Sequence, residues 1–198
     1  MTLFRSLALV IFVAPASARA DDRLVDDDTF AVSSRGALAV DAGLFLATPS
    51  ALPSGISTGL AVGLTRACGC HLAYGVRATW SSITESSGVY TVTQDDYRLR
   101  LTGEVRHEVG RGSVAVRLGI GPTFVHEVRV LDQGMRSGRT DLDRRAWGTV
   151  PAADLDARFA IHVAGPWLGI ASAGPSLDHS GGAFAWGWNA TLGVAWQP

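Results

Sequence analysis

The chain has 198 residues, with 17 basic and 18 acidic side chains, 47% hydrophobic residues and 2 Cys. That length suits one domain, or two small ones, and the net charge of −1 argues against a nucleic-acid-binding protein, which needs a basic stripe. The hydrophobic fraction is too high for a disordered chain, two Cys cannot build a disulfide scaffold, and no apolar stretch reaches the roughly 18 residues of a transmembrane helix.

Residues 1–20 have the three parts of a secretory signal peptide. Arg5 supplies the positive charge, Leu7–Val13 forms a short apolar core, and Ala18-Arg19-Ala20 places small residues at the positions that define a cleavage site. We predict cleavage after Ala20 and export of the chain. Residues 21–34 are acidic and have no clear period, which predicts a loose leader before one folded domain over residues 35–198.

Beyond Gly36 the hydrophobic residues recur with a period of two. The final segment shows this best, because one parity is apolar and bulky whereas the other is small or polar. Successive side chains of a strand point to opposite faces, whereas a helix would scatter these Trp residues around its circumference. The apolar parity of this segment consists of Phe184, Trp186, Trp188, Ala190, Leu192, Val194 and Trp196.

The same alternation predicts eight strands along the chain. In order they cover Leu38–Leu46, Gly59–Leu64, Leu72–Ser81, Tyr97–Val109, Val114–Val130, Trp147–Val163, Trp167–Leu177 and Ala183–Trp196. The fifth and sixth are the longest, so we expect them to project beyond a membrane on the side of the longer loops.

Short and long connections alternate between these strands. Tight turns are predicted at Cys68-Gly69-Cys70, Gly110-Arg111-Gly112 and Ala164-Gly165-Pro166. Longer polar loops are predicted at Thr48–Ile56, Thr84–Asp96, Asp132–Arg145 and Asp178–Gly182. One end of the folded domain therefore carries the turns and both termini, and the opposite end carries the loops.

Eight antiparallel strands can close into a barrel that has no free edge. Two barrels fit the pattern: a soluble secreted barrel with an apolar interior, of the lipocalin or streptavidin kind, and an inverted barrel with its apolar face in a membrane. Small residues and mixed charges share the polar parity, which suits a narrow and packed lumen. The predicted lumen network consists of Asp41, Arg77, Arg98, Arg100, Glu104, Arg106, Glu108, Arg117, Glu127, Arg129, Asp154, Asp156 and Arg158.

Three further features favour the membrane barrel. The apolar parity carries one Arg, Arg66, at a strand end, as expected because an Arg that faces lipid at mid-bilayer costs roughly 2–4 kcal/mol. Short turns on one side and long loops on the other match outer-membrane topology. Aromatic residues gather near the strand ends, and those predicted at the membrane interfaces are Trp80, Tyr97, Trp147, Trp167, Trp186 and Trp196. The predicted fold is an all-β, eight-stranded antiparallel up-and-down transmembrane β-barrel.

Residues 35–198 resemble the small eight-stranded outer-membrane β-barrels of Gram-negative bacteria. Gly121-Pro122-Thr123-Phe124 and Gly174-Pro175-Ser176-Leu177 look like the Gly-Pro steps frequent in these families. The final strand is similar to the C-terminal signal read by the barrel assembly machinery, although Gln197-Pro198 follow Trp196 where an aromatic residue usually ends the chain. The resemblance implies insertion from the periplasm into the outer membrane, with outer-membrane lipid and the assembly machinery as partners and loops at the cell surface.

The seventh strand departs from a simple alternation. Leu168 and Ile170 lie on one parity and Leu177 on the other. We predict a bulge between Ala171 and Gly174, where an extra residue resets the alternation. Local breaks in the ladder are also expected where no backbone N–H is available, at Pro122, Pro151 and Pro175.

Few side chains group into a recognisable catalytic or metal site. Cys68-Gly69-Cys70-His71 offers three metal ligands, but zinc or copper needs a fourth, so we favour a tight turn with free or disulfide-bonded Cys. The acid–base candidates are His126-Glu127, His162 near Asp154 and Asp156, and His179-Ser180 beside Asp178. We predict no catalytic residue, no metal and no cofactor.

The function that fits best is a non-enzymatic barrel with a charged, plugged lumen and a structural or adhesive role. Seven Arg and six acids of the predicted lumen network nearly balance, which favours ion pairs over an ion-selective pore. The long, charged loop Asp132–Arg145 is the expected contact site for an unidentified surface partner. The alternatives are a transport barrel for small or apolar molecules, an outer-membrane lipid-modifying enzyme and a secreted soluble ligand-binding barrel.

Overall fold

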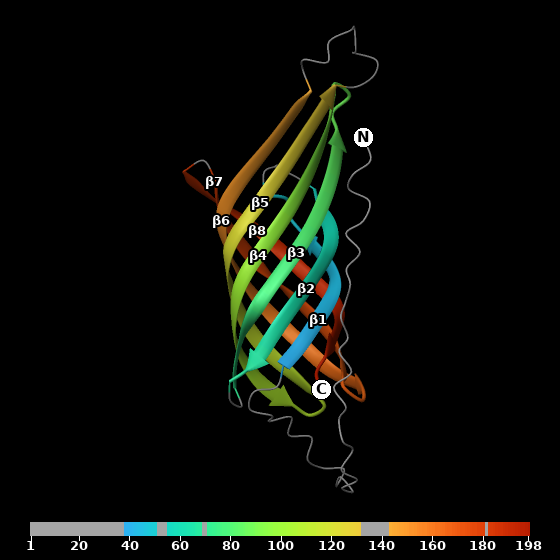
Figure 1. Cartoon of the computed structure of the whole chain (residues 1–198), viewed down its shortest axis with the longest axis vertical. Coiled ribbons are helices and arrows are strands. Elements are labelled where there is room, and N and C mark those ends of the chain that lie inside the picture. The colour runs from blue at the N-terminus through green and yellow to red at the C-terminus, as the bar shows by residue number, and fades with distance from the viewer. Residues whose placement is uncertain (1–37, 51–54, 69–70, 132–142, 181) are drawn as a thin grey trace, which may run out of the picture. The chain divides into compact units, whose positions relative to one another are not determined.

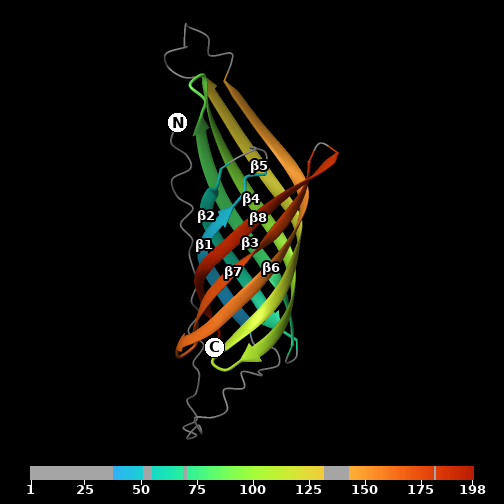
Figure 2. The same ribbon diagram turned by 180° about the vertical axis from the view of Figure 1, so that it is seen from behind.

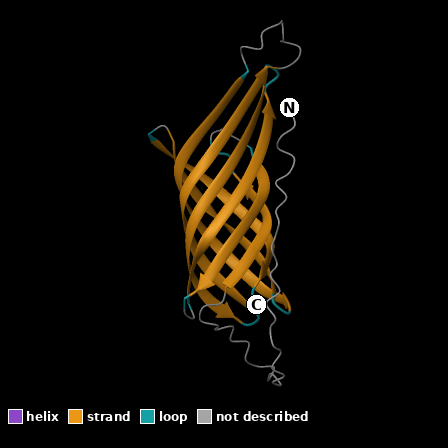
Figure 3. Ribbon diagram, in the orientation of Figure 1, coloured by secondary structure: helices purple, strands orange, loops and turns teal. Residues whose placement is uncertain are grey.

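The chain folds into a closed barrel of eight antiparallel strands, in which each strand pairs with its sequence neighbours and β8 pairs with β1 (Figure 1). A computed structural model describes residues 38–50, 55–68, 71–131, 143–180 and 182–198. These residues form strands, turns and short loops (Figure 3), and they contain no helix long and apolar enough to cross a bilayer. The predicted signal peptide, the predicted leader and Cys70 lie outside them.

The eight strands differ twofold in length. They are β1 (Leu38–Ala47), β2 (Ser57–Ala67), β3 (Leu72–Ser86), β4 (Tyr90–Val109), β5 (Gly112–Leu131), β6 (Arg144–Ala164), β7 (Trp167–Ser180) and β8 (Ala183–Trp196). β1 and β2 have 10 and 11 residues, whereas β5 and β6 have 20 and 21, as predicted, and β4 also has 20.

The long strands continue as a sheet after their neighbours have ended. Pairing of β2 with β3 stops at Thr58↔Ser82, and pairing of β6 with β7 stops at Ala152↔Asp178. Pairing of β4 with β5 reaches Tyr90↔Leu131, so β3, β4, β5 and β6 rise above the rest of the barrel wall (Figures 1 and 2). We call this four-stranded extension the projecting sheet.

Two of the four predicted long loops are wrong. Thr84–Asp96 lies mostly in β3 and β4, which are joined by a tight turn around Gly88, where φ is +80°. Asp178–Ser180 of the other segment likewise belong to β7. Both segments are polar on each parity, which is typical of a loop, but the face that points into this lumen is itself polar, so a strand here needs no apolar parity.

The direction of the alternation decides between the two barrels. Leu44, Leu101 and Leu192 point outward and are 64%, 65% and 67% exposed, whereas Arg100 and Asp156 point into the lumen and are each 2% exposed. An apolar interior is the defining feature of the soluble carrier barrel, so that alternative is wrong. The interior is ionic and the outer wall is apolar.

The predicted bulge in β7 is also wrong. The β7–β8 register is unbroken from Trp167↔Trp196 to Ser180↔Ala183, and Ile170, Ser172 and Ser176 all point inward and are buried. Ile170 therefore faces the lumen, where it packs against Ala160 and Ala195, and no reset of parity is needed. The register shift in this part of the barrel lies instead in β6, between His162 and Ala164.

Breaks in the ladder do occur at two of the three predicted prolines. Pairing of β4 with β5 is interrupted opposite Pro122, and pairing of β6 with β7 is interrupted opposite Pro175, with the register kept on both sides. Pro122 and Pro151 stand opposite one another in β5 and β6, where pairing continues. Arg100 Nη1 donates to the carbonyls of Gly121 and Pro122 at 3.2 and 2.7 Å, which satisfies acceptors at the first break.

At the break opposite Pro175, the backbone of β6 lies close to Gly174 of β7, and this close packing can be tested. A Cβ at Gly174 would collide with the Leu155 carbonyl oxygen, whereas a Cβ at Gly103 would meet nothing within 4 Å. We expect Gly174→Ala to lower the free energy of unfolding by about 1–3 kcal/mol, as overpacking does. Gly103→Ala should leave the free energy of unfolding unchanged or raise it. Urea titrations of the two variants measure the difference, and an equal loss of stability in both would contradict the register.

Candidate functional site

The lumen is built around Asp156, a carboxylate on β6 shared by two guanidinium groups. Its Oδ2 accepts from Arg117 Nη2 at 2.9 Å and from Arg77 Nη1 at 3.2 Å. Arg77 also donates to Thr191, and Arg117 to Ser172. These contacts therefore connect side chains of β3, β5, β6, β7 and β8 inside the lumen.

A second group of ions lies beside this centre. Arg158 contacts Glu104 Oε1 at 3.4 Å and Asp41 Oδ2 at 3.7 Å, and Arg106 donates to the same Glu104 oxygen at 3.0 Å. Because Asp41 lies on β1, Glu104 on β4 and Arg158 on β6, these contacts cross the lumen rather than follow its wall. They fill the bore with charge that is internally balanced.

A third ion pair anchors the wall at the first ladder break. Arg100 Nε donates to Asp154 Oδ2 at 2.6 Å, and its Nη2 donates to Thr123 Oγ1 at 2.9 Å. With the bonds from Nη1 to backbone carbonyls, this one guanidinium is bound through all three of its nitrogens. Such a saturated Arg acts as a structural brace and has little freedom to bind a solute.

Toward the projecting sheet, the residues that directly follow β1 contact charged side chains of the lumen. The backbone N–H and the hydroxyl of Ser50 both donate to Asp96 Oδ2 at 3.1 Å, and Arg98 Nη2 donates to the Thr48 carbonyl at 2.9 Å. Gln94 Nε2 donates to the other Asp96 oxygen at 2.7 Å. The start of the predicted loop Thr48–Ile56 thus folds inward, and its residues 51–54 lie outside the described residues.

An aromatic ring separates the two levels of charge. Phe45 on β1 points into the lumen and is 2% exposed. The guanidinium carbon of Arg77 lies 5.5 Å from the centre of its ring, and that of Arg98 lies 5.4 Å from it. Both distances are within the range of cation–π interactions. Phe45 therefore packs between the guanidinium groups of Arg77 and Arg98 inside the lumen.

Thirteen charged residues were predicted to line the lumen, and their positions differ along the barrel. Nine of them are almost fully buried: Asp41, Arg77, Arg98, Arg100, Glu104, Arg117, Asp154, Asp156 and Arg158. Arg106 and Glu127 are partly buried, whereas Glu108 and Arg129 are exposed at opposite ends. Glu127 and Arg129 form an ion pair on the projecting sheet, and that carboxylate raises the pKa of the Arg129 guanidinium.

Several lumen residues were missed from the sequence. Gln94 and Asp96 were assigned to a loop, and they are each 1% exposed in β4. Asp178 is likewise buried, on β7. Asp96 shares the parity of Arg98 two residues later, and this was the signal that could have extended the strand. The contact from Ser50 had no such signal, because it joins a loop to a strand across the bore.

The acid–base candidates do not assemble into a catalytic group. Asp178 points inward and His179 outward, where the imidazole packs against Phe184 at 4.7 Å. His162 contacts the carbonyl of Gly165, and the two Asp considered near it pair with Arg residues instead. His126 lies on the outer face, 3.7 Å from Asp95, whereas its sequence neighbour Glu127 points to the other face.

The Cys-rich turn shows no metal cluster in the described part of the chain. Cys68 is exposed and free, and His71 Nδ1 lies 3.3 Å from the Arg106 carbonyl. Among the described residues no three His, Cys, Asp or Glu side chains come together as a metal site requires. Cys70 lies outside the described residues.

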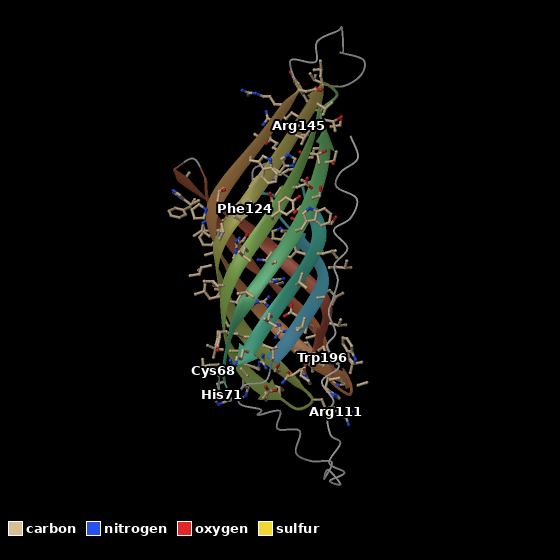
Figure 4. All side chains as sticks on the ribbon, viewed as in Figure 1. Cys68, His71, Arg111, Phe124, Arg145 and Trp196 are labelled. Atoms are coloured by element: carbon tan, nitrogen blue, oxygen red, sulfur yellow. The ribbon has the colours of Figure 1, made fainter. Side chains whose placement is uncertain are left out.

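Aromatic residues on the outer wall follow the register of the sheet. Trp80, Tyr97 and Phe124 are consecutive partners on β3, β4 and β5 and are each about 40% exposed. One row higher, Trp147 stacks on His126 at 4.4 Å. At the turn end Trp167 pairs with Trp196, which is only half-exposed. The wall therefore has an apolar band with aromatic rows near each end (Figure 4).

Comparisons with known proteins identify the fold. No family model matches the chain, and no curated protein matches it in sequence. Solved structures do match. A major outer membrane protein from Thermus thermophilus has a TM-score of 0.56 with 10% identity, over 83% of this chain and 100% of that one.

Two further structures have the same architecture. OprG from Pseudomonas aeruginosa has a TM-score of 0.53 with 10% identity, over 84% of this chain and 97% of that one. Ail, the attachment invasion locus protein of Yersinia pestis, has a TM-score of 0.51 with 10% identity, over 83% of this chain and 100% of that one. The fold is that of the eight-stranded outer-membrane β-barrels. At this identity the likeness carries the fold alone.

The shared carboxylate at the centre of the lumen can be tested by removing it. Asp156→Ala would leave Arg77 and Arg117 buried without their common partner, and we expect a loss of about 3–5 kcal/mol in the free energy of unfolding. Glu108→Ala is the control, because Glu108 is an exposed acid that pairs with no described residue. Urea titration of both variants in detergent measures the difference, and similar midpoints would contradict the central role of Asp156.

Proposed function

We propose that the protein is a non-enzymatic outer-membrane barrel whose projecting sheet attaches the cell surface to an acidic partner. The observation that supports this most is the projecting sheet, a hydrogen-bonded surface joined to a barrel whose lumen is filled by its own ions. Such a lumen leaves little room for a substrate, and the candidate catalytic side chains point apart. The name of Ail describes attachment, which agrees with an adhesive role for this architecture.

The outer wall supports the membrane location. Leu101 and Val163 are 65% and 66% exposed, large apolar side chains are exposed on all eight strands, and soluble monomers rarely leave so large an apolar surface in water. Strands of about 11 residues at ~3.3 Å each, tilted by ~45°, cover roughly 25 Å, the height of an outer-membrane apolar band. Export through a cleaved signal peptide after Ala20 belongs to this proposal.

The depth of the band can be tested with two Arg substitutions at equally exposed positions. Leu101→Arg lies between the two aromatic rows and should lower the free energy of unfolding in lipid vesicles by about 2–4 kcal/mol. Val163→Arg lies beside the turn at the end of β6 and should cost about 0–1 kcal/mol. Equal costs at the two positions would contradict the membrane location.

The adhesive proposal depends on the upper part of β6. Residues 144–150 pair with β5 on one side, and on the other side β7 has already ended its pairing at Asp178. The β7–β8 hairpin leans away from β6 at this point (Figures 1 and 2). A strand edge of this kind presents backbone N–H and C=O groups that an extended segment of another chain can pair with.

Charge on the same edge indicates the chemistry of the partner. Arg144 stands directly opposite Arg129 in the neighbouring strand, and Arg145 lies beside it at the far end of the barrel from Arg111 (Figure 4). Like charges directly opposite one another destabilise a sheet. Arg144 and Arg145 form no ion pair with a described residue, so an acidic extended polypeptide would complement them.

This placement revises the expected contact site. Arg144 and Arg145 were assigned to the loop Asp132–Arg145, but they begin β6. Residues 132–142 of that loop lie outside the described residues. The last two residues of the predicted contact loop therefore belong to a strand, which fixes their spacing.

Binding can be measured with a fluorescent poly-glutamate peptide and the barrel in neutral vesicles. Arg144→Ala combined with Arg145→Ala should weaken binding at least fivefold, because two charges of the edge are lost. Arg111→Ala, at the opposite end, should leave the affinity unchanged. If the double variant binds as tightly as the native chain, or if Arg111→Ala weakens binding equally, the adhesive surface lies elsewhere.

A further inference from the structure

Asp95 is a carboxylate on the outer face of the barrel, where most of its neighbours are apolar or aromatic. It lies on β4 two residues before Tyr97 and shares that face, and it is the only acid on the face within the four strands of the projecting sheet. Its side chain is 23% exposed, and its close ionic contact is His126 Nδ1 at 3.7 Å. A largely covered carboxylate that accepts no hydrogen bond from the described residues is costly unless a partner comes from outside the chain.

Aromatic rings from three strands stand beside this carboxylate. The indole of Trp147 stacks on the imidazole of His126 with ring centres 4.4 Å apart, and the ring of Tyr97 lies 6.1 Å from the same indole. Trp147 therefore extends from β6 across β5 toward β4. It is nonetheless 67% exposed, so the face that His126 does not cover is open. We call Asp95, Tyr97, His126 and Trp147 the Asp95 cluster.

The register places the Asp95 cluster where the apolar band ends. One row closer to the bilayer centre, Trp80, Tyr97 and Phe124 form the aromatic row described above. One row further out on β3 and β4, the hydroxyls of Thr84 and Thr93 lie 3.1 Å apart, so the same face becomes polar. The point where aromatic side chains give way to polar ones is the level of lipid headgroups.

Apolar side chains on β4 continue from the cluster into the band. Tyr97, Leu99 and Leu101 follow Asp95 at alternate positions, so all of them face outward, and the two Leu are 50% and 65% exposed. An acyl chain packed along these residues brings its headgroup to Asp95. A free cation in solution would gain nothing from them, so the cluster favours a lipid.

The charge and the rings together select a cationic group. Asp95 repels phosphate, and the face of an aromatic ring is the negative part of its quadrupole, which attracts ammonium groups. The outward cation nearest in the register is Arg145, which stands opposite Val128 and is two strands away from Asp95. It lies further from the band than the labelled Phe124 (Figure 4). The negative charge of Asp95 therefore dominates at the level of the cluster.

We propose that the Asp95 cluster binds a lipid whose headgroup carries a primary ammonium group. The ammonium N–H groups donate to the carboxylate of Asp95, the positive charge lies against the open face of Trp147, and an acyl chain follows Leu99 and Leu101. This goes beyond the adhesive function and rests only on the membrane location, which the pair Leu101→Arg and Val163→Arg tests separately.

Native mass spectrometry of the full chain in detergent micelles measures which lipid is retained. Three lipids with identical acyl chains are offered in equal amounts: phosphatidylethanolamine, phosphatidylglycerol and N-acetyl phosphatidylethanolamine, whose headgroup has lost its positive charge. We expect phosphatidylethanolamine to be retained about fivefold over each of the others, which corresponds to ~1 kcal/mol. Equal retention of the three lipids would overturn the proposal, and this result needs no variant to fold.

Variants of the cluster test the two contacts with the ammonium group. Asp95→Asn keeps the shape of the side chain but removes its charge, and it should make the retention of the three lipids equal. Trp147→Leu should lower the preference for phosphatidylethanolamine about twofold or more. The matched controls are Glu108→Gln, an exposed acid at the turn end, and Trp186→Leu, an exposed aromatic residue whose strand partner is Leu177. Both controls should keep the native preference.

The other outcomes contradict the site. An unchanged preference in Asp95→Asn, with the circular dichroism spectrum of the native barrel, would overturn the role of the carboxylate. An equal loss in Glu108→Gln would show that overall charge selects the lipid. An equal loss in Trp186→Leu would show that any interfacial aromatic residue serves, and the Asp95 cluster would then be no specific site.

Discussion

The structure depends on one constraint, that charged side chains from distant strands must find each other inside a bore only wide enough to hold them. Asp156 shows how it is met, because one carboxylate serves Arg77 and Arg117 from two other strands. Buried ion pairs give little net stability against apolar packing, but leaving one partner alone is costly. The ions therefore enforce closure and register, since any other pairing would leave charge unmatched.

Apolar residues complete this inverted arrangement on the outer wall. Their exposure is tolerable only where lipid replaces water, so the same alternation that brings the Arg residues inside prepares the outside for a bilayer. The rows of aromatic residues near both ends of the band follow directly from the cross-strand register. Fold and environment are thus specified by one pattern, while the surfaces beyond the band are free to differ.

The strands of this barrel are unequal in length, and the longer ones form the projecting sheet. The four strands of the projecting sheet continue after β2 and β7 have ended. The sheet carries a strand edge with basic side chains at the start of β6. This edge is a local addition to a fold shared at 10% identity with several outer-membrane barrels.

The sequence by itself determined the number of strands and most of their faces, because a period of two assigns each side chain to one of two sides. It did not determine which side was the interior, since alternation is symmetric, nor that Thr84–Asp96 continues as strands, since a sheet in water has no apolar parity. Closure of the barrel decided the partners: Ser50 meets Asp96, and Phe45 meets Arg77 and Arg98, only because curvature brings residues far apart in sequence across a narrow bore.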